Sequence, residues 1–369
     1  MGPTSHIAIF LPSFGGGGAE GVTVMLANAL AGRGHRVDLL VARDEGPNRA
    51  VVAGAVSVLS FSRGHVRSCV VPLARWLRRE RPRALLSMMN HANLAAVAAS
   101  RLSGSPHRLV LSERTFASRS IASEPSLKGV IIAQGIRHAY RLADAVVAVS
   151  ADVARDLAET YGLDASLLHV IHNPVDSDRV RAQAAREFDA PWWPAGHVST
   201  VLSVGRLTPQ KDHLTLLEAF AKVRRTNCAR LVILGEGELR AALERQVRAL
   251  GLEEDVMLPG YVANPFPAMA RAHCFVLSSA WEGFPNVLAE VAALGTPIVA
   301  TDCPGGSREI LGGVDGAELV PIGDVQAMSE AIERAIHSVR PVPALARRAA
   351  DFSVAKAVAA YEEVLGIRS

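Results

Sequence analysis

The 369-residue sequence is poor in cysteine, and its four cysteines lie in no spacing typical of a metal site. Cys69, Cys228, Cys274 and Cys303 are scattered along the chain without a CxxC pair. Neither zinc nor a disulfide framework is therefore indicated. Isolated cysteines of this kind are expected to be small buried residues in a reducing compartment.

Long apolar runs are also missing, although 49% of the residues are hydrophobic. No run approaches the ~18 to 20 residues that span a bilayer. The chain passes from Met1–Ser5 directly into an apolar strand, without the basic region and apolar core of a signal peptide. We therefore expect a cytoplasmic protein that buries its apolar residues in sheets and helices.

Lysine is scarce, since only four of the 39 basic residues are lysines. This argues against a phosphorylase that holds pyridoxal phosphate on a lysine. Arginines are concentrated in the first half, where segments 66–83 and 128–141 place them beside apolar residues. Each segment is either an ordinary covering helix with a solvated arginine face or a helix that contacts anionic lipid at the inner face of the cytoplasmic membrane. No interleaving of aromatic and basic residues indicates a nucleic-acid partner.

Both halves alternate short apolar strands with amphipathic helices, which predicts an α/β protein with two doubly wound parallel sheets. The expected strands lie near 6–12, 36–42, 56–61, 84–89, 108–112, 145–149 and 168–172, and near 199–204, 230–234, 255–258, 274–278, 297–300 and 317–320. Such sheets bind ligands beyond the carboxyl ends of their strands, so we expect the site in a cleft between two domains.

Prolines and a glycine between Asn173 and Gly196 break the periodicity, and we place the domain junction there. The predicted parts are a first domain at 1–172, a linker at 173–197, a second domain at 198–352 and a C-terminal helix within 353–369. That helix follows the last strand of the second sheet, and we expect it to cross back onto the first domain. The Asp176-Ser177-Asp178 segment is predicted to be a helix cap rather than a metal site.

Two glutamates eight residues apart, Glu282 and Glu290, flank a Gly-Phe-Pro loop that follows an apolar strand. Pro285 predicts the first position of a helix, where a missing N–H group has no cost. The free N–H groups and positive dipole end of a helix start suit a phosphate.

A second motif lies at the end of the strand that reaches Gly205. Arg206 and Lys211 flank a proline-containing turn, and Asp212 opens the following helix. Two cations at the carboxyl end of a strand can neutralise a diphosphate leaving group. Two solvated surface cations are the alternative.

Four glycines, Gly15 to Gly18, separate the first strand from a helix. They allow close approach of a backbone to a ligand, and the helix start favours an anion. A dinucleotide site would require an acidic residue ~20 residues further on, and Asp38 and Asp44 fit that register poorly. A flexible loop and a contact with phosphate or sugar remain the alternatives.

Several segments together resemble glycosyltransferase family 4, the retaining transferases of the GT-B fold with two Rossmann-like domains. They are the Gly-Gly-Ala-Glu loop, SVGRLTPQKD, LVILGEGELR and the stretch from LPGYVANPF to ATDCPGG. The resemblance covers essentially the whole chain and is most specific from Val201 to Gly306. It implies a nucleotide-sugar donor on the second domain and an acceptor on the first, with no essential metal or other cofactor.

At the level of residues, the resemblance implies that Arg206 and Lys211 hold the donor diphosphate. It further implies that Glu290 binds the ribose hydroxyls and that Glu282 faces the transferred sugar. Tyr261 and Val262 would receive the base. The remaining donor contacts are implied at Gly16, Gly17, Gly205, Gly235, Gly283, Phe284, Asn286, Val287 and Leu288.

The first domain departs from the common family pattern, which has Thr-x-His after the fifth strand. Here the sequence reads Leu111-Ser112-Glu113-Arg114-Thr115, similar to a subset of bacterial surface-polysaccharide and lipid-linked-oligosaccharide transferases. His91, at the end of the preceding strand, and Glu113 are then the candidates for handling the acceptor proton. A structural hydrogen-bonding role is the alternative for His91.

The resemblance thus implies a retaining transferase that moves a hexose or N-acetylhexosamine from a nucleotide sugar, with UDP as the expected nucleotide. The acceptor would be a hydroxyl of a glycan or a polyprenyl-linked glycan. Two alternatives stay open: a nucleotide-sugar epimerase on the same fold, and a non-catalytic nucleotide-sugar-binding protein.

Overall fold

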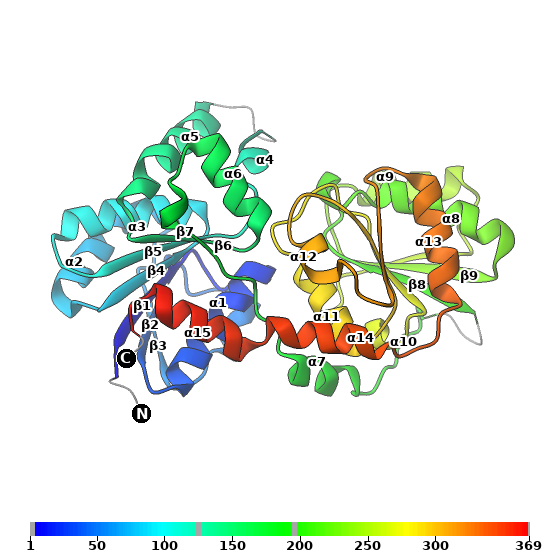
Figure 1. Cartoon of the computed structure of the whole chain (residues 1–369), viewed down its shortest axis with the longest axis horizontal. Coiled ribbons are helices and arrows are strands. Elements are labelled where there is room, and N and C mark those ends of the chain that lie inside the picture. The colour runs from blue at the N-terminus through cyan, green and yellow to red at the C-terminus, as the bar shows by residue number, and fades with distance from the viewer. Residues whose placement is uncertain (1–3, 123–126, 194–197, 368–369) are drawn as a thin grey trace. The chain divides into compact units, whose positions relative to one another are not determined.

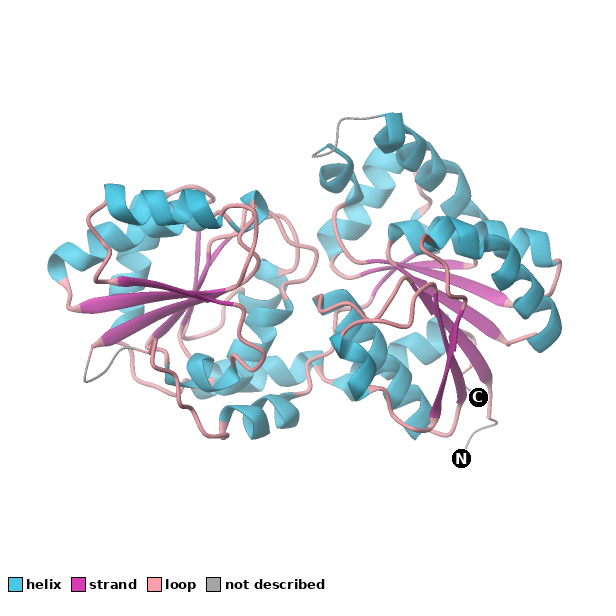
Figure 2. Ribbon diagram, turned by 180° about the vertical axis from the view of Figure 1, so that it is seen from behind, coloured by secondary structure: helices cyan, strands magenta, loops and turns pink. Residues whose placement is uncertain are grey.

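The computed structural model describes residues 4–122, 127–193 and 198–367. The chain divides into two compact units, Met1–Pro174 together with Val354–Ser369, and Val175–Ser353. Within the described residues each unit contains one parallel sheet with helices on both faces (Figures 1 and 2). The prediction of two doubly wound α/β sheets is confirmed.

The first unit contains a seven-stranded sheet in the order β3-β2-β1-β4-β5-β6-β7, counted over the described residues. Its strands are β1 (His6–Leu11), β2 (Arg36–Val41), β3 (Val56–Ser60), β4 (Ala84–Met88), β5 (Arg108–Glu113), β6 (Ala145–Ala148) and β7 (Leu168–Val170). Its helices are α1 (Gly18–Gly32), α2 (Val70–Glu80), α3 (Asn90–Ser103), α4 (Ala117–Ala122), α5 (Leu127–Ala139), α6 (Ala151–Tyr161) and α15 (Val354–Val364), with 3-10 turns η1 (Pro47–Val51), η2 (Val66–Cys69), η3 (Tyr140–Leu142) and η4 (Ala165–Leu167). The central strands are almost continuously apolar because helices cover them on both faces.

The second unit contains a six-stranded sheet in the order β10-β9-β8-β11-β12-β13, again over the described residues. Its strands are β8 (Ser199–Val204), β9 (Ala229–Leu234), β10 (Val256–Gly260), β11 (Cys274–Leu277), β12 (Ile298–Thr301) and β13 (Ala317–Val320). Its helices are α7 (Ser177–Ala184), α8 (His213–Thr226), α9 (Arg240–Ala249), α10 (Phe266–Arg271), α11 (Asn286–Leu294), α12 (Ser307–Leu311), α13 (Val325–Ile336) and α14 (Pro343–Ala349), with 3-10 turns η5 (Pro209–Lys211) and η6 (Ala350–Phe352). The order changes direction beside β8, which places the loops after β8 and β11 next to each other.

The last helix, α15, belongs to the first unit. It lies beside α1 (Figure 1), and Val358, Tyr361 and Leu365 are buried in the same apolar cluster as the central strands. Glu362 adds an ion pair with Arg33, the C-cap residue of α1, at 2.7 Å. The C-terminal segment is therefore part of the core of the first unit.

The segment predicted as a linker, 173–197, contains helix α7, which packs against α10 and α11 in the second unit. Here the structure differs from the predicted boundaries. Only Val180 and Ala184 of α7 are buried, so the sequence shows too short an apolar pattern to reveal the helix. Asp176 caps α7 by accepting from the Arg179 amide at 2.9 Å, which confirms the predicted helix cap. Residues 194–197 of the predicted linker lie outside the described residues.

Of the two basic segments, 66–83 forms a covering helix. Leu73, Trp76 and Leu77 of α2 are buried while Arg75, Arg78 and Arg79 are exposed. The second segment differs, because Val130 and Ile131 of α5 are 58% and 63% exposed. No helix in the described ranges is both long and apolar enough to cross a membrane.

Three of the four cysteines are buried, as expected, but Cys228 is exposed. Cys228 lies in the short turn between α8 and β9.

Candidate functional site

The loops at the carboxyl edge of the second sheet are joined to one another through their backbones. A Cβ atom at Gly235, after β9, would overlap the carbonyl oxygen of Gly205, after β8. A Cβ atom at Gly305, after β12, would likewise overlap the carbonyl oxygen of Glu282. Both glycines have positive φ angles, 147° and 123°. This edge of the sheet is therefore a fixed frame whose side chains have defined positions.

Lys211 and Glu282, which come from different loops of this frame, form an ion pair. Lys211 Nζ lies 2.5 Å from Glu282 Oε1, and Ser279 Oγ donates to the same oxygen at 2.6 Å. The Glu282 side chain is 8% exposed and that of Lys211 is 14% exposed. The structure thus brings together two residues to which the resemblance gave separate roles, one on the diphosphate and one on the sugar.

Ser279 was not among the predicted site residues. It lies two residues after the end of β11, and its carbonyl oxygen accepts from Thr301 Oγ1 of β12 at 2.5 Å. The neighbouring Ser278 donates to the carbonyl oxygen of Lys211 at 2.7 Å. The sequence did contain a signal for these two site residues, because a pair of serines follows a buried strand at its carboxyl end.

Arg206 differs from Lys211 in being exposed, and its side chain has no ion pair or hydrogen bond within the described part of the chain. Its charge is therefore fully available at the end of β8. Asp212 opens α8 as expected, accepting from Thr215 N at 3.3 Å. Next to it, His213 is buried, and burial together with the Lys211 charge lowers the pKa of its imidazole to about 4. His213 is thus neutral beside the lysine.

Helix α11 begins at Asn286, so Pro285 occupies the N-cap and not the first helical position. The Leu288 amide donates to the carbonyl oxygen of Pro285 at 2.9 Å. The N–H group of Leu288 is therefore already used inside the first turn of α11. Phe284 is buried against Phe352, and Gly283 accepts from the Gly306 amide at 3.1 Å.

Glu290 lies one turn inside α11 and is half-buried. Desolvation raises the pKa of its carboxyl to about 7, although the positive charge of Arg179 from α7 opposes the shift. Glu290 therefore changes charge near neutral pH, which a carboxylate in water does not do.

The predicted base-binding residues follow β10. Tyr261 is 70% exposed and Val262 is half-buried. An open tyrosine ring beside a strand end can stack on a planar base.

In the first unit, Glu113 at the end of β5 is buried and faces away from the surface. Its Oε2 accepts from Tyr140 OH at 2.8 Å, and Asn93 of α3 donates to the same Tyr140 oxygen at 3.0 Å. Burial raises the pKa of Glu113 to about 7. His91 is exposed in the first turn of α3. The carboxyl group of Glu113 thus serves a buried hydrogen-bond cluster, which fits an anchoring role for Tyr140 better than proton transfer at the surface.

The glycine loop precedes α1, with Gly17 as its N-cap. Gly16 and Gly17 are both exposed. Among the residues that the structure describes, no three His, Cys, Asp or Glu side chains gather as a metal site.

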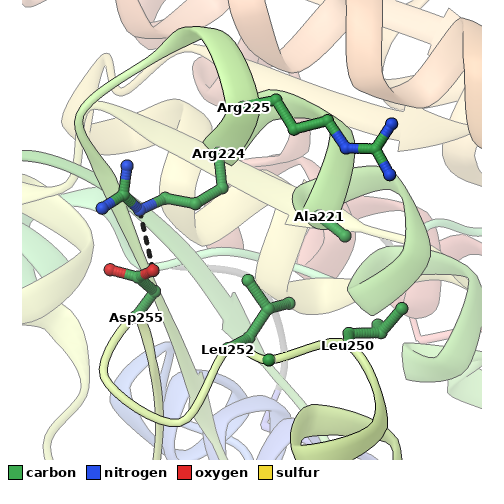
Figure 3. A pocket seen from close by; sticks show the side chains of 7 residues that line it. Ala221, Arg224, Arg225, Leu250, Leu252 and Asp255 are labelled. Atoms are coloured by element: carbon green, nitrogen blue, oxygen red, sulfur yellow. Dashed lines mark ion pairs between the residues drawn. The ribbon is translucent and has the colours of Figure 1, made fainter.

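A pocket of about 230 Å³ lies at the opposite, amino edge of the second sheet (Figure 3). It is lined by Ala221, Arg224, Arg225, Leu250, Gly251, Leu252 and Asp255. Arg224 is paired with Asp255 at 2.8 Å, whereas Arg225 points away from that pair. Because ligands of doubly wound sheets bind at the carboxyl edge, this pocket is separate from the candidate site.

Comparisons with known proteins agree with this arrangement. Residues 16–179 match the family described as Glycosyltransferase Family 4, and residues 198–338 match Glycosyl transferases group 1. The chain is 28% identical over 329 residues to the lipopolysaccharide core biosynthesis glycosyltransferase LpsE of Rhizobium meliloti, covering 87% of this chain and 86% of that one.

A second relative is the N-acetylgalactosamine-N,N'-diacetylbacillosaminyl-diphospho-undecaprenol 4-alpha-N-acetylgalactosaminyltransferase of Campylobacter jejuni, with 30% identity over 66% of this chain. The match spans 64% of that relative's length. Among solved structures, HepE of Anabaena in complex with UDP has the same fold, with a TM-score of 0.77, 20% identity and coverage of 98% and 99% of the two chains. The expected GT-B architecture is confirmed, and the chain belongs to glycosyltransferase family 4.

Proposed function

We propose that this protein is a retaining glycosyltransferase that transfers a hexose or N-acetylhexosamine from a UDP-sugar to a hydroxyl of a glycan or lipid-linked glycan. The observation that carries the proposal is the paired Lys211 and Glu282 at the carboxyl edge of the second sheet, with exposed Arg206 in the adjoining loop. Two cations and one buried carboxylate on neighbouring loops support a site for a diphosphate and its sugar.

The leaving group determines what the cations do. As the bond to the sugar breaks, negative charge grows on the diphosphate, and fixed cations in a poorly hydrated site stabilise that charge. Arg206 has no partner among the described residues to give up, so it can meet the phosphates directly. Lys211 is shared between Glu282 and the donor, which couples phosphate binding to the position of the carboxylate.

Once Lys211 turns to the phosphates, Glu282 retains the hydrogen bond from Ser279. Its remaining acceptor sites can then take hydroxyl groups of the transferred sugar. Glu290 would bind the ribose hydroxyls in its ionised form, and the amides of Asn286 and Val287 would lie near the phosphates at the start of α11. Tyr261 would stack on the base.

The choice of donor and acceptor draws on related proteins. The solved structures of HepE include complexes with UDP and with UDP-glucose, which supports a uridine nucleotide. The name of the Campylobacter relative specifies a diphospho-undecaprenol acceptor, and that of the Rhizobium relative specifies lipopolysaccharide core synthesis. A glycan, free or lipid-linked, is therefore the proposed acceptor class.

The proposal is tested with Lys211→Ala and Glu290→Ala, using Lys222→Ala as the matched control. Lys222 is also on the second unit, but it is exposed and contacts Gln326 instead of the candidate site. With a panel of UDP-, GDP- and ADP-sugars and membrane-extracted acceptor lipids, product mass should show transfer by the wild type and the control only. Unchanged turnover in both site variants would refute the assignment.

The same assay separates transfer from epimerisation. An epimerase converts a UDP-sugar into its epimer without any acceptor, whereas a transferase leaves the donor sugar unchanged until an acceptor is added. Activity that persists in EDTA would support the proposal that no metal is required, because the cations and helix starts then neutralise the diphosphate.

We further propose that α5 brings the protein to an anionic membrane surface. The exposed Val130 and Ile131 lie on the same helix as the exposed Arg137. Apolar side chains flanked by basic ones suit the interface of an anionic bilayer. Val130→Ser with Ile131→Ser should reduce cosedimentation with phosphatidylglycerol vesicles, whereas equal binding by the double variant would exclude this surface.

A further inference from the structure

Ser279, in the loop after β11, directs its hydroxyl group at a carboxylate of the candidate site. The residue is fully buried, and its Oγ donates to Glu282 Oε1 at 2.6 Å. The same oxygen pairs with Lys211 Nζ at 2.5 Å. Among the residues that the structure describes, Glu282 Oε2 has no hydrogen bond or ion pair. One oxygen of this carboxylate thus has two donors, while the other is left open.

The backbone that carries Lys211 is fastened to the same loop. Ser278 Oγ donates to the carbonyl oxygen of Lys211 at 2.7 Å. The Ala280 amide donates to the carbonyl oxygen of Gln210 at 2.8 Å, and Gln210 Nε2 donates to the carbonyl oxygen of Trp281 at 3.0 Å. Because these bonds hold the two loops together, a change of partner by the lysine takes place in its side chain.

The side chain of Lys211 lies against Gly205, the residue that follows β8. A Cβ atom at Gly205 would lie 3.3 Å from Lys211 Cε and 3.4 Å from Lys211 Cδ. The flexible stem of the lysine therefore runs over bare backbone. Gly205 directly precedes Arg206, the exposed cation at the end of β8. The amino group can thus turn from Glu282 toward phosphates beside Arg206 while both loops keep their positions.

Such a turn leaves a buried charge behind. The Glu282 side chain is 8% exposed, and a buried carboxylate that loses its cation is strongly destabilised unless other donors satisfy it. The Ser279 hydroxyl cannot follow the lysine, because an ammonium group has no acceptor. Within the described parts of the chain, Ser279 is therefore the side-chain donor that remains on Glu282, and hydrogen bonds to ionised groups are the strong ones.

We propose that Ser279 is a positioning residue, which holds Glu282 Oε1 in place while Lys211 turns from the carboxylate to the diphosphate of the donor. Glu282 Oε2 then stays available, in a fixed direction, to a hydroxyl of the transferred sugar. This role rests on the proposed transferase function and assigns one further residue to it.

The first test measures nucleotide affinity by calorimetry, with the nucleoside diphosphate of the active donor, expected to be UDP. Ser279→Ala should weaken UDP binding about 10- to 100-fold, because the lysine can then turn away only by leaving Glu282 without a donor. Ser279→Thr keeps the hydroxyl and should retain most of the affinity. Wild-type affinity in Ser279→Ala overturns the proposal, as does a folded Ser279→Thr that binds no better than Ser279→Ala.

The matched control is Ser329→Ala. Ser329 of α13 is also a buried serine of the second unit, at 3% exposed, and its Oγ donates to the carbonyl oxygen of Gln326 at 2.8 Å. This variant should lose a similar buried hydrogen bond and keep full UDP affinity. Chemical denaturation of both variants completes the comparison. If Ser279→Ala, like the control, loses stability but no affinity, the hydroxyl is merely structural and the proposal fails.

The second test is a double-mutant cycle with Glu282→Gln. In that variant no charge is left behind when Lys211 turns away, so adding Ser279→Ala should not weaken UDP binding further. An equal loss of affinity in both backgrounds would mean that Ser279 acts on the nucleotide independently of the carboxylate, which contradicts the proposal.

Steady-state transfer tests the direction of Glu282 Oε2. Without the hydroxyl the carboxylate can rotate, so Ser279→Ala should lower kcat/KM for the UDP-sugar by a larger factor than it weakens UDP binding. Equal factors would show that Ser279 does not orient the carboxylate toward the sugar. Absence of both nucleotide binding and transfer by the wild type, with every donor, would instead refute the proposed function itself.

Discussion

Glu290 is the residue whose behaviour should depend most clearly on pH. Burial raises the pKa of its carboxyl from 4.5 to about 7, so a proton must leave before the ionised form can bind ribose hydroxyls. UDP affinity of the wild type should therefore rise ~10-fold between pH 6 and pH 8 relative to Glu290→Gln. Calorimetric titration of both proteins across this range gives the ratio of their UDP affinities. The ionisation of UDP itself affects both proteins equally and cancels in this ratio.

The same shift has a consequence for stability with the opposite sign. A raised folded-state pKa stabilises the protein fully below the unfolded value of 4.5, and this contribution is lost as the pH rises through about 7. Glu290→Gln should therefore gain stability relative to the wild type over that interval. A difference that is independent of pH would show that Glu290 titrates normally.

At the scale of single residues, the sequence indicated which residues belong to the candidate site but not which of them contact one another. Glu282 and Lys211 were both identified, yet they are 71 residues apart, and nothing in a one-dimensional pattern reveals that they share an oxygen-to-nitrogen contact of 2.5 Å. The surroundings of Glu113 could not be predicted for a similar reason. Its burial depends on Tyr140 and Asn93, which come from other elements.

At the scale of elements, the packing of loops on one another is the feature that single substitutions test most directly. Gly235→Ala forces the loop after β9 away from the carbonyl group of Gly205, and should destabilise the second unit by about 2–4 kcal/mol. Gly251→Ala is the control, since Gly251 also has a positive φ of 67° but has no atom within 4 Å of an added Cβ. It should cost only the backbone strain of about 1–2 kcal/mol.

Chemical denaturation followed by tryptophan fluorescence would measure both variants. Equal destabilisation by the two substitutions would show that strain, and not the contact between the loops, is what Gly235 avoids. UDP binding should weaken only in Gly235→Ala, because Gly251 follows α9 far from the carboxyl edge of the strands.

The regular elements were largely predictable because buried parallel strands are short and apolar and are separated by amphipathic helices. Each predicted strand is present within a few residues of its expected bounds. Helices α7, α10, α12 and α14, of which only the cap of α7 was predicted, are five to eight residues long. Segments this short contain too few turns for a helical period to be recognised.

At the scale of the whole molecule, two fully buried leucines twenty residues apart should affect different units. Leu345 of α14 is buried in the second unit, while Leu365, just after α15, is buried in the first. Leu345→Ala and Leu365→Ala should each cost about 2–5 kcal/mol. Hydrogen exchange should increase around α11 in the former and around β1 and β4 in the latter.

If Leu365→Ala instead raised exchange in the second unit, the assignment of the C-terminal segment to the first unit would be wrong. The matched pair controls for residue type and burial, since both side chains are fully inaccessible.

The return of the chain to its first unit also determines the order in which the protein can be completed during synthesis. A ribosome makes every residue of the second unit before it reaches Val354, whereas the first unit must wait for Val358, Tyr361 and Leu365. The half that is translated first is thus the last to obtain its full core. Until then its apolar surface beside α1 is open, and this is the interval in which nascent chains most need protection from aggregation.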